Sequence, residues 1–91
     1  MTMKRLSTEE LLKQALNEQL CRTQVANVKD HGSYNLWEIE LNNNNILMSE
    51  LGTISEVTGD DDLQIESRGN WMYVVATIDD DMIEEIRSQY E

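Results

Sequence analysis

The side chains of this sequence that are most able to do chemistry are carboxylates, and six of them stand in two runs of three. The runs are Asp60-Asp61-Asp62 and Asp79-Asp80-Asp81, and Glu84 and Glu85 follow the second run closely. Ionised carboxylates accept hydrogen bonds, pair with basic side chains and bind hard metal ions. In an apolar pocket a carboxyl group can also act as a general acid. The elements that position these groups decide among those uses.

Groups that could join the carboxylates in a catalytic or metal site are scarce. His31 is the only histidine and follows Asp30 in a predicted turn, Cys21 is the only cysteine, and nothing in the sequence brings the two together. Asp60–Asp62 and Glu66 lack the alternating spacing of a calcium loop, and no Cys/His cluster could bind zinc. We therefore expect no enzyme, no metal site and no cofactor. A weak divalent-cation site is the alternative that the carboxylates leave open.

Length and composition indicate a single domain, residues 1–91, because a chain of 91 residues encloses one core. The apolar share of 40% is sufficient for that core, and no apolar run approaches the roughly 20 residues that span a bilayer. Residues 1–6 are not followed by the apolar stretch of a signal peptide, and one cysteine suits a reducing compartment. We expect a cytoplasmic protein with no membrane segment, in which Cys21 is a small buried residue.

The charge of the chain is strongly negative and unevenly distributed. The net charge is −11. Residues 1–30 hold five basic and four acidic residues, a net of +1, whereas residues 31–91 hold two basic and fourteen acidic residues, a net of −12. Duplex DNA carries about one charge per 1.7 Å, so this excess equals that of roughly 20 Å of duplex. Such a chain repels nucleic acid and is attracted to the basic grooves that bind it.

The clearest element is a helix from Thr8 to Leu20. Ser7 and Glu10 form a capping box at its start, and leucines recur every four residues from Leu12 onward. A short C-terminal helix is predicted after Asp79–Asp81, because aspartate is favoured at a helix start and apolar residues then recur at helical spacing.

Alternating apolar and polar residues predict strands between the helices. The predicted strands are residues 23–29, 34–41, 63–67 and 71–78. Residues 68–70 supply the tight turn of a hairpin between the last two. Residues 46–51 and 53–58 are weaker strand candidates on either side of Gly52. Trp37 and Trp71 fall in strand patterns and are expected in the core. The expected fold is α+β, an antiparallel β meander of about four to six strands with an N-terminal and a C-terminal helix packed on one face.

The hairpin places the two aspartate runs together, because one run precedes its first strand and the other follows its second. If simple hairpins continue backward, the Asn42–Asn45 loop also lies at that edge and brings Glu40 near. The candidate partner-binding residues are Asp60, Asp61, Asp62, Asp79, Asp80, Asp81, Glu84, Glu85, Glu38 and Glu40.

In size, acidity and lack of catalytic groups, the chain resembles the small phage-encoded anti-defence inhibitors, the anti-CRISPR and anti-restriction proteins that mimic DNA. Asp60–Asp62, Asp79–Asp81, Glu84 and Glu85 carry this resemblance, which is one of composition and involves no motif. It implies an inhibitor in the host cytoplasm that occupies the basic groove of a CRISPR effector or restriction nuclease, without binding nucleic acid directly.

Two other functions remain open from the sequence. An immunity protein or antitoxin that neutralises a basic nuclease toxin uses the same electrostatics, and a toxin gene beside this one would favour it. A structural or assembly protein with an apolar interface is the third alternative. Its association would barely change with salt, whereas electrostatic capture weakens steeply.

Overall fold

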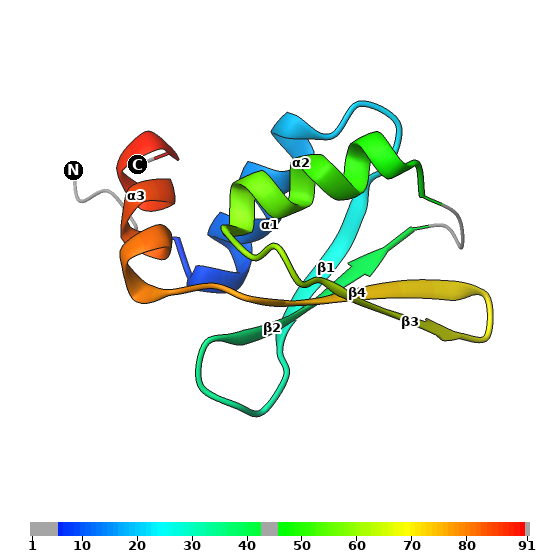
Figure 1. Cartoon of the computed structure of the whole chain (residues 1–91). Coiled ribbons are helices and arrows are strands. Elements are labelled where there is room, and N and C mark those ends of the chain that lie inside the picture. The colour runs from blue at the N-terminus through cyan, green and yellow to red at the C-terminus, as the bar shows by residue number, and fades with distance from the viewer. Residues whose placement is uncertain (1–5, 43–45, 91) are drawn as a thin grey trace.

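The structure of the chain is a computed structural model, and it describes residues 6–42 and 46–90. Within these residues, three helices and four strands follow in the order helix, two strands, helix, two strands, helix (Figure 1). Their bounds are α1 Thr8–Gln19, β1 Val25–Asp30, β2 Leu36–Leu41, α2 Met48–Thr58, β3 Gln64–Arg68, β4 Trp71–Thr77 and α3 Asp80–Tyr90. The strands form one antiparallel sheet in the order β1-β2-β4-β3, so the predicted α+β class with helices at both ends is confirmed.

Two hairpins build this sheet. β1 pairs with β2 and β3 pairs with β4, while the contact between β2 and β4 joins the hairpins. In that central pair Leu36 lies opposite Thr77 and Leu41 lies opposite Met72. Helix α2 then carries the chain from the end of β2 to the far edge of the sheet, where β3 begins. The consecutive strands β2 and β3 are therefore not neighbours.

All three helices lie on one side of the sheet (Figure 1). α1 packs on β1 and also contacts α2 and α3, while α3 lies beyond the end of β4. The core between the layers is one apolar cluster, and each large side chain that it buries contributes roughly 1.5–3 kcal/mol. Its largest fully buried members include Leu11, Leu12, Leu16, Ile39, Leu41, Ile54 and Ile78. We call the side of the sheet that no described helix covers the outer face.

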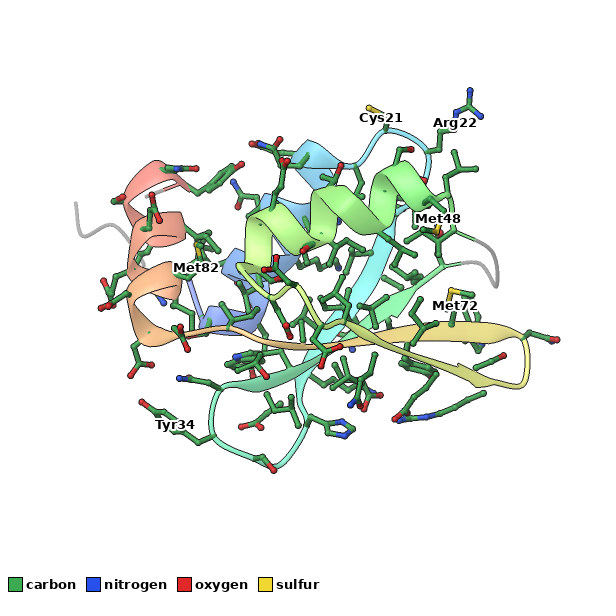
Figure 2. All side chains as sticks on the ribbon, viewed as in Figure 1. Cys21, Arg22, Tyr34, Met48, Met72 and Met82 are labelled. Carbon is green, nitrogen blue, oxygen red and sulfur yellow. The ribbon has the colours of Figure 1, made fainter. Side chains whose placement is uncertain are left out.

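The start of α1 follows the predicted capping pattern, since the Ser7 hydroxyl accepts a hydrogen bond from the Glu10 amide at 3.2 Å. The helix ends at Gln19, and Leu20 is an extended, buried C-cap residue. Cys21 comes next and is exposed, so its predicted burial is wrong (Figure 2). The physical reason is the extended backbone at Leu20, which turns that side chain into the core and the next one outward.

Helix α2 replaces the strands predicted at residues 46–51 and 53–58, and that prediction is wrong. Its buried residues are Glu50, Ile54 and Thr58, which recur every four residues as on one helix face. Several β-branched residues favoured strands on propensity alone, and Gly52 was interpreted as the break between them. Contact with the core outweighs such local preferences, which are worth less than about 1 kcal/mol each.

The two tryptophans differ in burial. Trp37 packs against the core as predicted, whereas Trp71, the first residue of β4, is 45% exposed. Trp71 is paired with Arg68 beside the β3–β4 turn, where Gly69 has a φ of 63°. Trp71 lies on the same face of β4 as Tyr73 and Val75, which is the outer face and not the core face, so the predicted core place of Trp71 is wrong.

Candidate functional site

The loop that carries Asp60, Asp61 and Asp62 is fixed by the end of α2. Gly59 takes the left-handed conformation that closes many helices, with φ 76°, and its amide donates to the Ser55 carbonyl at 2.8 Å. The Ser55 hydroxyl donates to the Asp60 carbonyl at 2.7 Å, and the Asp60 amide donates to the Thr58 hydroxyl at 3.3 Å. The first aspartate run therefore starts from a well-defined turn.

The side chain of Asp60 joins this loop to the end of β4. Its Oδ2 accepts from the Thr77 amide at 2.8 Å, and its Oδ1 accepts from the Asp62 amide at 2.8 Å. Thr77 stands two residues before Asp79, so the two aspartate runs are neighbours in space, as the hairpin predicted. Asp60 itself is half-buried and occupied by these backbone donors.

The second run forms the start of α3. Ile83 donates its amide to the Asp79 carbonyl at 3.0 Å, and Asp80 and Asp81 lie in the first turn of the helix. Negative side chains are stabilised there by the partial positive charge of the unpaired amides. Local helix chemistry thus accounts for the placement of these aspartates.

Tyr34 adds an aromatic ring to the same end of the sheet. It projects from the turn between β1 and β2 and is 80% exposed (Figure 2). Its hydroxyl donates to Asp80 Oδ2, and this bond together with the negative charge of Asp80 raises the pKa of Tyr34. The turn is held to β4 because the Ile78 amide donates to the Asn35 carbonyl at 2.8 Å. The sequence pattern predicts a strand at Tyr34 and gives no signal for this contact.

These residues form one negatively charged end of the molecule. We call Asp60, Asp61, Asp62, Asp79, Asp80 and Asp81 together the acidic end. All except Asp60 are exposed. Among residues 6–42 and 46–90, no basic side chain forms an ion pair with any of the six. The charges of the five exposed aspartates therefore face the solvent without a basic partner in that part of the chain.

Helix α3 extends this charge away from the acidic end. Glu84 follows Asp80 by four residues and Glu85 follows Asp81 by four residues, and both glutamates are exposed. Residues four apart are neighbours on a helix surface, so the carboxylates form two short columns along α3. The predicted extension of the patch by Glu84 and Glu85 agrees with this placement.

Glu38 and Glu40 do not belong to the acidic end, so the predicted position of Glu40 near the aspartate runs is wrong. The register puts Glu40 opposite Tyr73 and Glu38 opposite Val75, both on the outer face. The end of β2 points toward the β3–β4 turn, at the opposite end of the sheet from Asp79. The prediction failed because β2 leads into α2 and not into a hairpin. Of the Asn42–Asn45 loop, residues 43–45 lie outside the described residues.

Glu38 instead belongs to a cluster of paired charges on the outer face. Its carboxylate lies 2.8 Å from Arg68 Nη1 and 3.0 Å from His31 Nδ1, and Arg68 Nη2 lies 2.5 Å from Glu66. The Arg68 guanidinium also stacks on Tyr73, 4.4 Å from the ring centroid. Burial alone would raise the pKa of Glu38, but the bonds from His31 and Arg68 outweigh it and lower that pKa. The sequence signal that could have predicted this cluster is the alternating pattern of the strands, which puts Glu38, Glu66 and Arg68 on the polar face of the sheet.

Glu50, near the start of α2, is a carboxylate that the sequence pattern does not single out. It is 6% exposed and accepts the Thr23 hydroxyl at 2.6 Å and the amides of Arg22 and Thr23 at 2.8 and 2.9 Å. The hydroxyl bond is the main cause that lowers the pKa of Glu50, against the opposing effect of burial. Glu50 therefore ties α2 to the connection between α1 and β1 and has a structural role.

Neither a metal centre nor a membrane span is found in the part of the chain that the structure describes. No group of three or more His, Cys, Asp or Glu side chains there is arranged to hold a metal ion. No helix in those residues combines the length and apolar character needed to cross a bilayer.

Comparison of the chain with protein-family models, with curated proteins and with solved structures finds no match.

Proposed function

We propose that this chain is a non-catalytic inhibitor that binds a basic nucleic-acid-binding protein through the acidic end and occupies its nucleic-acid groove. The partner class is a CRISPR effector, a restriction nuclease or a toxin nuclease, and the site of action is the cytoplasm. The observation that carries the proposal is the convergence of six aspartates without a basic partner among the described residues. Helix starts and turns explain each run alone, but neither requires that both runs meet.

Electrostatics favour a basic partner for such a surface. Exposed charges act over about a Debye length, roughly 8–10 Å at physiological salt, so several carboxylates at one end attract a groove lined by lysine and arginine. Attraction of this kind raises association rates and selects partners by charge. The same field repels phosphate, which supports a protein partner over nucleic acid.

The arrangement of the reactive side chains supports a non-catalytic role. Cys21 follows α1 and His31 follows β1, so the length of β1 separates the cysteine from the histidine. His31 is bonded to Glu38 on the outer face. Neither residue has the nucleophile-and-base geometry that covalent catalysis requires.

Charge reversal at the acidic end tests the proposal. Asp61→Lys and Asp79→Lys combined change exposed side chains that make no described ion pair, and they spare Asp60 and Asp80, whose carboxylates accept hydrogen bonds. Glu9→Lys and Glu18→Lys on α1 make a control with the same change in charge. One glutamate lies in the first turn of that helix and one near its end, so the dipole effects of the control oppose each other.

The measurement is capture of partners from a cell lysate by each immobilised variant, followed by a DNA-binding assay of the captured protein. We expect a basic nucleic-acid-binding protein that the wild type and the α1 control retain and the acidic-end variant loses. Added duplex DNA should compete with the wild type for it, and higher salt should release it. Equal retention by the acidic-end variant, or a partner that still binds DNA normally in the complex, would contradict the proposal.

A further inference from the structure

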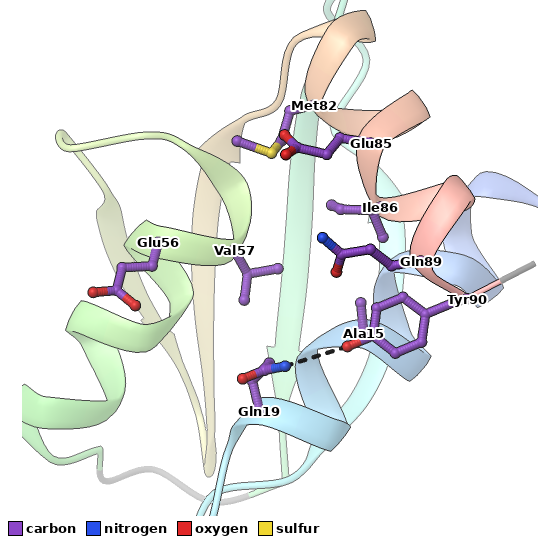
Figure 3. Close-up of a pocket in the computed structure, with 9 residues that line it drawn as sticks. All are labelled: Ala15, Gln19, Glu56, Val57, Met82, Glu85, Ile86, Gln89 and Tyr90. Atoms are coloured by element: carbon purple, nitrogen blue, oxygen red, sulfur yellow. Dashed lines mark hydrogen bonds between the residues drawn. The ribbon is translucent and has the colours of Figure 1, made fainter.

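A groove lies between the three helices, outside the acidic end (Figure 3). It has a volume of about 300 Å³. The apolar part of its lining comes from all three helices: Ala15 from α1, Val57 from α2, and Met82 and Ile86 from α3. Gln19 and Tyr90 close one end, where the Gln19 amide donates to the Tyr90 hydroxyl at 3.3 Å. The groove is therefore an open surface of mixed character, in which apolar side chains from all three helices are flanked by polar and acidic ones.

Helix packing explains why this space is open. α1 packs against both α2 and α3, so it forms the base, and the other two helices form the walls. The walls approach each other where α2 ends, because a Cβ at Gly59 would lie 3.0 Å from the Met82 methyl group. Toward Gln19 and Tyr90 the walls separate (Figure 3). A further helix laid between α2 and α3 would extend the helical layer of the molecule.

The charge around the groove is negative. Glu56 of α2 and Glu85 of α3 belong to its lining, and both are exposed, while no lysine or arginine lines it. The narrow end adjoins the acidic end, since Gly59 directly precedes Asp60 and Met82 directly follows Asp81. An occupant with both apolar and basic side chains could fill the groove with the apolar ones and pair the basic ones with the carboxylates of the groove and the acidic end.

We propose that this groove binds a basic amphipathic helix of the partner protein. A volume of about 300 Å³ is at the small end for ligand sites, so it takes a few apolar side chains and not a whole element. The backbones of α1, α2 and α3 are hydrogen-bonded internally and offer no edge to an extended peptide. Apolar residues spaced along one face of a helix are what fill such a groove. The inference rests on the proposed function and names the part of the partner that is recognised.

The test uses two synthetic peptides of the same length and composition, each about 18 residues of leucine and lysine. In the patterned peptide the leucines share one helix face, and in the scrambled peptide they do not. Gln89→Trp places a large side chain from the exposed α3 wall into the groove, and Gln14→Trp on the exposed surface of α1 is the matched control. Peptide affinity is measured by fluorescence anisotropy, folding is checked by circular dichroism, and NMR follows the methyl groups of Met82, Val57 and Ile86.

We expect the wild type to bind the patterned peptide about tenfold more tightly than the scrambled one. Gln89→Trp should remove this preference, Gln14→Trp should keep it, and the three methyl signals should shift with the patterned peptide alone. Equal affinity of the wild type for both peptides, or a preference that survives Gln89→Trp, would overturn the inference. The double variant Asp61→Lys, Asp79→Lys separates the two proposals, because it should weaken the binding of both peptides by the same factor. If both peptides bind it as well as they bind the wild type, the proposed function fails.

Discussion

The acidic end and the outer face of the sheet are both rich in carboxylates, but they differ in what surrounds those groups. On the outer face, Glu38 and Glu66 are paired with Arg68, and His31 contributes a further bond to Glu38. At the acidic end, Asp61, Asp62, Asp79 and Asp81 face the solvent without an ion pair among the described residues. A carboxylate that is already paired with a basic side chain has little charge left to attract another protein. The two surfaces therefore differ in how many of their carboxylates are unpaired and not in how many carboxylates they contain.

Glu50 and Asp60 form a third situation, in which the carboxylate accepts backbone amides. Such groups hold elements together, and the protein loses stability when they are removed. Exposed charges mainly affect association. The molecule thus separates its acidic residues into those that hold elements of the fold together and those that are exposed without an ion pair among the described residues. The variants below test where this separation lies.

The largest loss of stability is expected from Glu50→Ala. Three donors from Arg22 and Thr23 would lose their acceptor at a buried place, which costs about 3 kcal/mol of unfolding free energy. Glu56→Ala, at an exposed position of the same helix, is the control and should cost less than about 0.5 kcal/mol. Urea denaturation of both variants makes the comparison, and equal losses would show that Glu50 is not a structural carboxylate.

Acid should unfold the chain partly through Glu50 and Glu38. Both have folded-state pKa values below the ordinary range, so their contribution is fully present above the unfolded pKa of about 4.3. It is lost as the pH falls through the folded values. Stability measured between neutral and acidic pH should therefore fall less steeply in Glu50→Gln than in the wild type. Parallel curves of stability against pH would show that Glu50 does not contribute to unfolding by acid.

Asp60→Ala should have a smaller effect, because its carboxylate accepts two amides in a half-buried loop. The expected cost is about 1–2 kcal/mol of unfolding free energy, measured in urea. Hydrogen exchange of the Thr77 and Asp62 amides should become faster in the same variant. A stability equal to that of Asp61→Ala would mean that Asp60 is one more solvent-facing charge.

On the outer face, Glu38→Gln should cost about 1 kcal/mol, since a largely buried side chain loses charge-assisted bonds but keeps its shape. Glu40→Gln on the same strand is the control, because Glu40 forms no ion pair among the described residues. Thermal denaturation at low and high salt distinguishes the two. If neither responds, the cluster around Arg68 does not stabilise the sheet.

The smallest change in stability is expected from the double variant Asp61→Lys, Asp79→Lys. Both positions are exposed and unpaired in the described chain, and only the lysine at Asp79, directly before α3, opposes a helix dipole, so the unfolding free energy should fall by less than about 1 kcal/mol. The same variant should show the largest change in binding. A strongly destabilised protein would indicate that these aspartates support the fold, and the comparison between the two surfaces would fail.

The elements with strong local signals were predictable from the sequence. The capping residues Ser7 and Glu10 fixed the start of α1, and the turn around Gly69 indicated the hairpin of β3 and β4. Because the two strands of a hairpin share an edge, the meeting of Asp60 with the residues before Asp79 followed without coordinates. These inferences needed contacts only between segments that are close in the sequence.

The remaining features depend on contacts between distant segments. α2 is helical because Ile54 and Glu50 contact the core and the α1–β1 connection, while its β-branched residues favoured strands. Glu40 was misplaced because the order of strands in the sheet is decided by how the two hairpins pack. The groove between the helices and the pairing of Glu38 with Arg68 have the same origin, and neither has a local signature.

The bonds of Asp60 also bear on the entropy of association. This side chain holds the loop after α2 to β4 and to the Asp62 amide, and the Ser55 hydroxyl holds its backbone. A loop restrained at several points loses little conformational freedom when a partner docks, so less of the interaction energy is offset by ordering. The charges next to Asp60 consequently form a preorganised arrangement whose spacing the proposed partner would have to match.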